Sequence, residues 1–204
     1  MGNTIFDMSV SLDGYVTAAD SSAQQPLGAG GEVLHEWALG GDPADAEVMA
    51  AGAERLGAII AGRRTYDASI HWWGPDGPTG PRRLPLFVVT HRAPEEVPTD
   101  SVYTFVTAGP EAALDQARAA AGDADVAIMG GPDIGRQYLA KGLVDEIGLH
   151  VVPVLFGAGT RMFGDLVDGH VALEPVEVTP APSATHLRYR VVRAADAPAG
   201  ALAD

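Results

Sequence analysis

The chain has 204 residues, 13 basic against 27 acidic side chains, and no cysteine. Its length predicts a single α/β domain, the missing thiols exclude disulfides and thiolate zinc sites, and a net charge of −14 argues against nucleic acid or anionic membranes as partners. Because no apolar run approaches the roughly 18 residues of a membrane span, we expect a cytoplasmic protein. Residues 1–193 are expected to form the domain, and 194–204, rich in Ala, Pro, Gly and Asp, a disordered tail.

Apolar periodicity and turn residues predict where the elements lie along the chain. Strands are expected over 4–17 with a break at Asp13-Gly14, 57–62, 86–90, 102–107, 125–129, 146–155, and a closing hairpin of 171–179 with 185–193. Helices are expected over 32–39, 44–56, 110–121 and 134–141. The polar segment 18–31 and the Pro-, Gly- and Trp-rich segment 69–85 are expected to be loops.

Three of the expected strands end in groups that suit an anionic ligand. Gly62-Arg63-Arg64-Thr65, Thr90-His91-Arg92 and Gly130-Gly131 each follow an apolar run directly. Ligands of open α/β sheets collect outside the carboxyl ends of the strands, and guanidinium, hydroxyl and glycine N–H donors suit phosphates. Paired glycines before a helix are also ordinary turn residues, so it is the repetition of such groups that favours a binding site.

These motifs resemble those of the dihydrofolate reductase superfamily, in particular the reductase domain of riboflavin biosynthesis proteins. The matching motifs are Ser11-Leu12-Asp13-Gly14, Gly62-Arg63-Arg64-Thr65-Tyr66, Phe87-Val88-Val89-Thr90-His91-Arg92, Met129-Gly130-Gly131 and Leu143-Val144-Asp145-Glu146. The resemblance implies a single-domain α/β fold with a mixed, mostly parallel sheet, flanking helices and a C-terminal antiparallel hairpin. It also implies a homodimer. A Rossmann dehydrogenase is disfavoured because the G-x-G-x-x-G motif is missing.

The resemblance further implies NADPH as the cofactor. The residues implied at the pyrophosphate and its adjoining ribose are Gly62, Arg63, Arg64 and Thr65. Those implied at the 2′-phosphate are Thr90, His91 and Arg92. Gly130 and Gly131, often joined by a cis peptide in this family, would let the pyrophosphate and nicotinamide ribose approach. Arg92 is expected to select NADPH over NADH, because guanidinium pairs with phosphate bidentately.

Candidates on the substrate side have structural alternatives. Asp13 is a candidate to position or protonate the substrate, but its Ser-x-Asp-Gly context is equally a good turn. Asp133 is a second candidate, although a first-turn carboxylate is equally favoured by the helix dipole. The other expected pocket residues are Tyr15, Glu36, Trp37, Trp72 and Trp73. The last two fit stacking on a heterocycle, anchoring of a loop, or a subunit interface.

Two departures from the family pattern affect the expected substrate. The first strand carries Asp7 where riboflavin enzymes often carry a basic residue for a ribosyl phosphate, and Gly135 stands where dihydrofolate reductases commonly have tyrosine. Folate and the riboflavin precursor are therefore disfavoured, and the histidine spacing predicts no metal site. We expect an NADPH-dependent reductase of a small heterocyclic or carbonyl-bearing molecule. The alternatives are a non-catalytic NADPH-binding or sensing protein and a phosphate-binding domain without nicotinamide.

Overall fold

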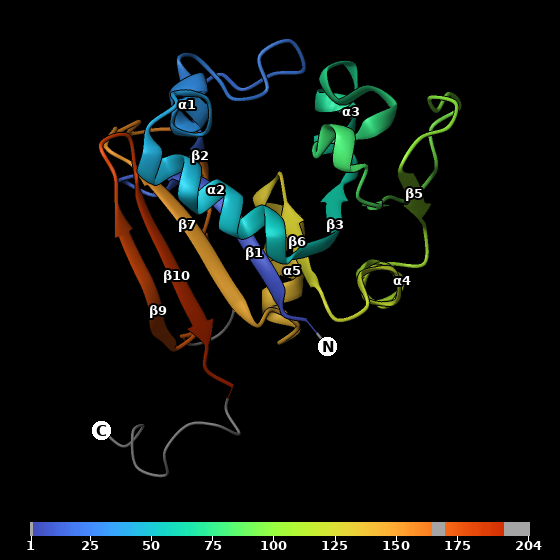
Figure 1. The fold of residues 1–204 in the computed structure, drawn as a ribbon. Coiled ribbons are helices and arrows are strands. Elements are labelled where there is room, and N and C mark those ends of the chain that lie inside the picture. Colours follow the sequence, from blue (N-terminus) through green and yellow to red (C-terminus); the bar gives the residue numbers. More distant parts are fainter. Residues whose placement is uncertain (1, 165–169, 194–204) are drawn as a thin grey trace.

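The computed structural model describes residues 2–164 and 170–193, and these form a sheet with helices on both faces (Figure 1). The strands of the main sheet are β1 (Thr4–Ser11), β3 (Leu56–Gly62), β4 (Leu86–Val89), β5 (Tyr103–Val106), β6 (Asp125–Met129), β7 (Glu146–Val152), β9 (Leu173–Pro180) and β10 (Thr185–Val191). Two short strands, β2 (Tyr15–Thr17) and β8 (Thr160–Arg161), pair separately. The helices are α1 (Glu36–Leu39), α2 (Pro43–Arg55), α3 (Arg63–Trp73), α4 (Pro110–Ala121) and α5 (Pro132–Ala140).

The strand order of the main sheet is β5-β4-β3-β6-β1-β7-β10-β9. From β5 to β7 every neighbouring pair is parallel, and β10 and β9 add an antiparallel hairpin at the edge. The expected fold class is thereby confirmed. The expected disordered tail, 194–204, lies outside the described residues, and none of the described helices is long and apolar enough to cross a membrane.

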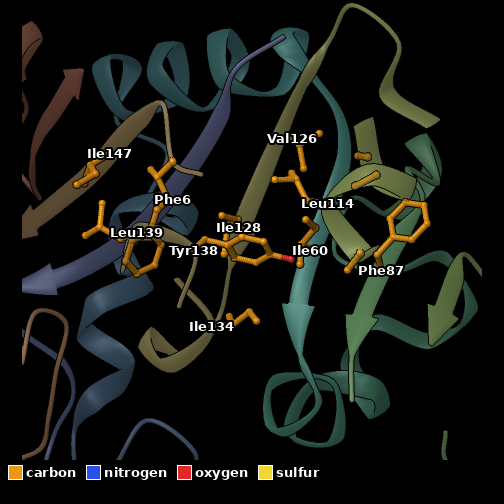
Figure 2. Packing of buried hydrophobic residues seen from close by; sticks show 14 of the residues in the cluster. Phe6, Ile60, Phe87, Leu114, Val126, Ile128, Ile134, Tyr138, Leu139 and Ile147 are labelled. Carbon is orange, nitrogen blue, oxygen red and sulfur yellow. The ribbon is translucent and has the colours of Figure 1, made fainter. Parts of the chain in front are cut away.

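The strands β3 and β4 are buried at successive positions, and therefore on both faces, which explains their continuous apolar runs. On one face, α4 and α5 cover a core that contains Phe6, Ile60, Leu114 and Ile128 (Figure 2). Tyr138 joins this core and donates its hydroxyl to the Pro110 carbonyl at 2.6 Å. The buried hydroxyl thus has a partner and ties α5 to the start of α4.

Gly135 makes the packing of α5 on the sheet possible. A Cβ at this position would lie 2.2 Å from ring atoms of Phe6, far inside the roughly 3.5–4.0 Å of a normal carbon contact. The helix can therefore approach β1 only because this residue has no side chain. The departure from the tyrosine of dihydrofolate reductases has a packing reason in this chain.

The opposite face of the sheet carries two smaller apolar clusters. One, with Ile59 and Tyr66, lies under α3, and the other, with Leu34 and Trp37, lies under α1. On the central strands between them, side chains such as Met129 and Asp7 are only partly buried. Figure 1 shows α1 and α3 apart on this side of the sheet. This central region is the less covered part of the sheet.

The expected loop over 69–85 is wrong at its start. Residues 63–73 form α3, and short 3₁₀ turns follow at Gly74–Asp76 and Gly80–Arg82. The helix buries Tyr66 and packs Ile70 and Trp73 against the same cluster, so its apolar face recurs at helical spacing. It ends at Gly74, whose φ of 54° favours glycine.

Candidate functional site

The first two parts of the expected site lie at the carboxyl ends of adjacent strands. Gly62 precedes α3 at the end of β3, and Gly131 precedes α5 after β6. Neither helix has a side-chain cap, because glycine occupies each N-cap position. The free first-turn N–H groups and the positive ends of the helix dipoles therefore favour an anion at this edge of the sheet.

Thr65 joins these two helix starts. Its hydroxyl oxygen accepts a hydrogen bond from the Gly131 N–H at 2.9 Å. A Cβ at Gly130, whose φ is 95°, would lie 2.3 Å from the same oxygen, so Thr65 itself requires glycine there. The peptide bonds of the described residues are all trans, which corrects the cis peptide expected between Gly130 and Gly131.

The third part of the site follows β4 and is linked to α3 by Arg63. The Arg63 guanidinium pairs with Asp67 at 2.7 Å and donates to the Arg92 carbonyl at 2.7 Å. The Thr90 hydroxyl donates to the same carbonyl at 2.8 Å. Two side-chain donors thus hold the backbone of this turn through the Arg92 carbonyl, while the side chains of His91 and Arg92 are exposed. The structure therefore brings together all three strand ends expected from the sequence.

Arg64 and Asp133 lie beside this arrangement at its solvent side. The Arg64 side chain is 91% exposed and lies 3.5 Å from the Asp133 carboxylate. Asp133 also pairs with Arg136 one turn further along α5. Its position in the first turn of α5 agrees with the structural role of a carboxylate at a positive helix end.

Asp13 is held by three donors in the turn after β1. The Phe156 and Gly157 N–H groups donate to its carboxylate at 3.1 and 2.7 Å, and the Ser11 hydroxyl donates at 2.6 Å. These hydrogen bonds, led by that of Ser11, lower the pKa of Asp13 to about 2. Both carboxylate oxygens are occupied by donors of the chain, which favours the structural role of Asp13 over that of a proton donor.

Tyr15 and Trp37 are buried rather than open to a ligand. The Tyr15 hydroxyl donates to the Gly157 carbonyl at 3.2 Å, and the Arg161 guanidinium lies over its ring. Trp37 donates its indole N–H to Ser9 at 2.9 Å and lies against the ring of His150. Tyr15 thus ties β2 to the segment before β8, and Trp37 ties α1 to β1 and β7.

The remaining expected pocket residues are not brought together. Glu36 is exposed on α1, and Trp72 is 81% exposed on α3. Trp73 instead packs into the cluster under α3, which supports the anchoring alternative for this residue. Glu36 thus lies on one helix, and Trp72 and Trp73 lie on another.

The structure shows one polar chain that the sequence did not predict. His150 Nε2 lies 3.1 Å from Asp7 Oδ1, His150 Nδ1 lies 2.7 Å from His186 Nδ1, and His186 Nε2 lies 2.8 Å from Asp45 Oδ1. We call these four residues the His150–His186 chain. No group of three or more His, Asp or Glu in the described part could hold a metal ion.

Comparison with known proteins gives a matching family and similar structures. A profile of the RibD C-terminal domain matches residues 3–187. A structure from Shewanella sp. PV-4, described as a riboflavin biosynthesis protein, is 24% identical with a TM-score of 0.69, and the match covers 94% of this chain and 99% of that one. A pyrimidine reductase-like protein from Corynebacterium diphtheriae is 16% identical with a TM-score of 0.61, over 94% and 92% of the two chains.

A larger protein from Thermotoga maritima also has a similar region. This pyrimidine deaminase and uracil reductase is 12% identical with a TM-score of 0.62, and the match covers 94% of this chain but only 57% of that one. At these low sequence identities, the similarity of the three structures to this protein concerns the fold alone. The comparison with curated proteins gave no match.

Proposed function

Because the chain belongs to the RibD C-terminal domain family, a family of reductases with the dihydrofolate reductase fold, we propose that it is an NADPH-dependent reductase. Its substrate in this proposal is a small heterocyclic or carbonyl-bearing molecule. The observation that carries the proposal is the pair of uncapped helix starts, α3 and α5, on adjacent strands. Bound NADPH would supply the hydride, while the protein must bind the cofactor, orient the substrate and provide a proton.

The donors at the strand ends fit the phosphate groups of a dinucleotide. Free N–H groups of the α3 and α5 first turns would hold the pyrophosphate, with Arg64 beside it. Arg63 would keep the turn after β4 in place through its bond to the Arg92 carbonyl. Among the described residues, the Arg92 guanidinium has no ion pair or hydrogen bond, and it would be available for the 2′-phosphate.

The substrate would lie over the central strands, between α1 and α3. Met129 and Asp7 are incompletely covered there, and they stand close to the glycines at the end of β6. A carboxylate favours a substrate with N–H donors or positive charge and disfavours a phosphate at that place. We therefore place amino-substituted heterocycles first among the substrate classes.

Thermal unfolding with and without nucleotide tests the cofactor. NADPH at 100 times its dissociation constant should stabilise the fold by about 2.7 kcal/mol, a rise in Tm of roughly 5–10 °C for a domain of this size. NADH should act only at much higher concentration. Failure of both nucleotides to raise the Tm or quench Trp fluorescence would remove the cofactor from the proposal.

Arg92→Ala tests the choice of nucleotide. A charge-assisted pair contributes about 1.5–3 kcal/mol, so NADPH affinity should fall roughly 10- to 100-fold while NADH affinity stays the same. Arg193→Ala is the matched control, because Arg193 pairs with Asp145 at the opposite end of the parallel strands. Equal effects of the two variants, or none from Arg92→Ala, would take Arg92 out of this role.

Oxidation of NADPH, followed at 340 nm with pterins, pyrimidines, quinones and carbonyls, tests the reductase activity. Turnover with an amino-substituted heterocycle would support the proposal. The hydrogen bonds that hold both carboxylate oxygens of Asp13 within the chain favour the alternative of a non-catalytic NADPH-binding protein, because they give this residue a structural role. Tight NADPH binding without turnover across the panel would support that alternative.

A further inference from the structure

The His150–His186 chain of hydrogen bonds runs across strands β1, β7 and β10 to helix α2. One of its ends is partly exposed to solvent and the other is buried. Asp7 on β1 has a side chain that is 44% exposed, and its carboxylate lies over Gly148, where a Cβ would be 2.2 Å from Oδ2. Asp45 on α2 is 1% exposed and His186 on β10 is 5% exposed. The chain therefore connects a buried carboxylate to one at the surface of the central strands.

The contacts of the chain require one proton more than neutral histidines provide. Each of the three contacts joins two atoms that both accept hydrogen bonds unless a hydrogen lies between them. Three contacts therefore need three hydrogens, and two neutral imidazoles bring only two. The geometry is satisfied when the chain holds one additional proton, shared as an imidazolium between His150 and His186.

The surroundings stabilise a positive charge at this place. Asp45 Oδ2 is buried and has no hydrogen-bond partner among the described residues, so its carboxylate depends on a nearby cation to offset the cost of burial. The Trp37 ring lies 4.1 Å from that of His150, within the range of a cation–π contact.

The exposed end of the chain lies next to the proposed cofactor site. β1 and β6 are paired up to Phe6 and Ile128, so Asp7 is level with Met129, the residue before Gly130. Beyond this level β1 continues to Ser11 alongside β7 alone. A substrate over the central strands would therefore have the Asp7 carboxyl group on one side and the glycine turn on the other.

We propose that the His150–His186 chain stores the proton that the reduction consumes and delivers it to the substrate through Asp7. This inference rests on the proposed function. Asp7 is the catalytic residue in it, because it would touch the substrate, whereas His150, His186 and Asp45 are positioning residues that act through it. The role of proton donor is thereby assigned to Asp7 in place of Asp13.

The proton that this step consumes comes in the end from water. The unsaturated carbon of the substrate accepts the hydride, the electron pair of its π bond moves to the heteroatom, and the heteroatom takes a proton from the Asp7 carboxyl group. Asp7 receives this proton from His150 Nε2. The chain then has two hydrogens for three contacts, and uptake of a proton from water restores the third.

Other charged groups on the same face have partners of their own. Arg188 on β10 lies 3.8 Å from Glu146 on β7 and 3.1 Å from Glu177 on β9. Arg55 at the end of α2 pairs with Glu146 and with Asp125. The groups that face the two histidines are therefore Asp7, Asp45 and His35.

The hydrogen count can be measured without any substrate. Nitrogen-15 NMR of labelled histidine side chains reports which ring nitrogens carry a hydrogen. Near neutral pH we expect three on the rings of His150 and His186 together. In Asp45→Asn, which keeps an acceptor but removes the buried charge, we expect fewer ring hydrogens than in the wild-type protein at the same pH.

The pH dependence of turnover tests the role of this proton. With the best substrate of the panel, kcat should fall as the pH rises, and in Asp45→Asn it should fall at lower pH with KM and NADPH affinity unchanged. Asp7→Asn should lower kcat at least 10-fold without weakening NADPH binding. Asp125→Asn is the matched control, since this buried carboxylate pairs with Arg55 at the other end of the sheet and should cost stability only.

The outcomes separate this inference from the proposed function. Two ring hydrogens near neutral pH in the wild-type protein would overturn the stored proton, whether or not NADPH binds. Turnover in Asp45→Asn with the wild-type pH profile would overturn the role of the chain while leaving the reductase intact. Absence of NADPH binding would overturn the proposed function, and with it the delivery step, while the NMR count decides the stored proton by itself.

Discussion

Gly135→Ala tests whether this glycine serves the packing of α5. The added Cβ would lie 2.2 Å from Phe6 ring atoms, so the ring or the helix must move by more than about 1 Å to reach a normal contact. Overpacking of this kind costs about 1–3 kcal/mol, and alanine returns about 1 kcal/mol through its helix propensity. The balance is a net loss of up to about 2 kcal/mol, measured by urea unfolding.

Two further variants make this measurement specific. Gly52→Ala is the matched control, because a Cβ at Gly52 in α2 has no atom within 4 Å and should stabilise the protein by about 0.5–1 kcal/mol. Phe6→Leu should relieve the collision, so Gly135→Ala should cost less in that background. Equal gains from Gly52→Ala and Gly135→Ala would refute the packing explanation for the glycine.

Three other changes have expected outcomes. Thr65→Val removes the acceptor of the Gly131 N–H and should cost about 1 kcal/mol and weaken NADPH binding; unchanged urea unfolding and affinity would contradict this. The pKa of Asp13 lies at about 2 in the folded protein against 3.8 ordinarily, so the stability that its carboxylate contributes to the fold is complete above pH 3.8 and is lost toward pH 2. In Asp13→Asn the free energy of unfolding in urea should therefore depend less on pH over that range, and an unaltered pH dependence would contradict this. Trp72→Ala should change stability by less than about 0.5 kcal/mol and Trp73→Ala by more, and the reverse order in thermal unfolding would disprove the anchoring role.

Local sequence patterns were sufficient to predict most of the fold. The apolar run of β3 and the Gly-Pro start of α4 are signals within a few residues, and both elements were predicted close to their observed bounds. The helix α3 was missed because Thr, Tyr, His and Trp have modest helix propensity and Gly and Pro follow them. The spacing of Tyr66, Ile70 and Trp73 could have revealed it.

The candidate site was predictable only where neighbouring residues in sequence form it. The three polar strand ends are short motifs, and parallel strands bring their carboxyl ends to one edge without further information. The His150–His186 chain joins residues that are 143, 36 and 141 positions apart. His150 and His186 meet because β7 and β10 pair in one register, and no local pattern predicts that register.

The attachment of α2 has a consequence for the motions of the protein. Among the residues of this helix, Asp45 is the one with a fully buried side chain, so α2 is held to the sheet by a charged hydrogen bond more than by apolar area. Amide hydrogen exchange in α2 should therefore depend on pH more steeply than exchange in α4, which buries three apolar residues. Opening of this helix would expose the buried end of the His150–His186 chain, Asp45 and His186, to solvent.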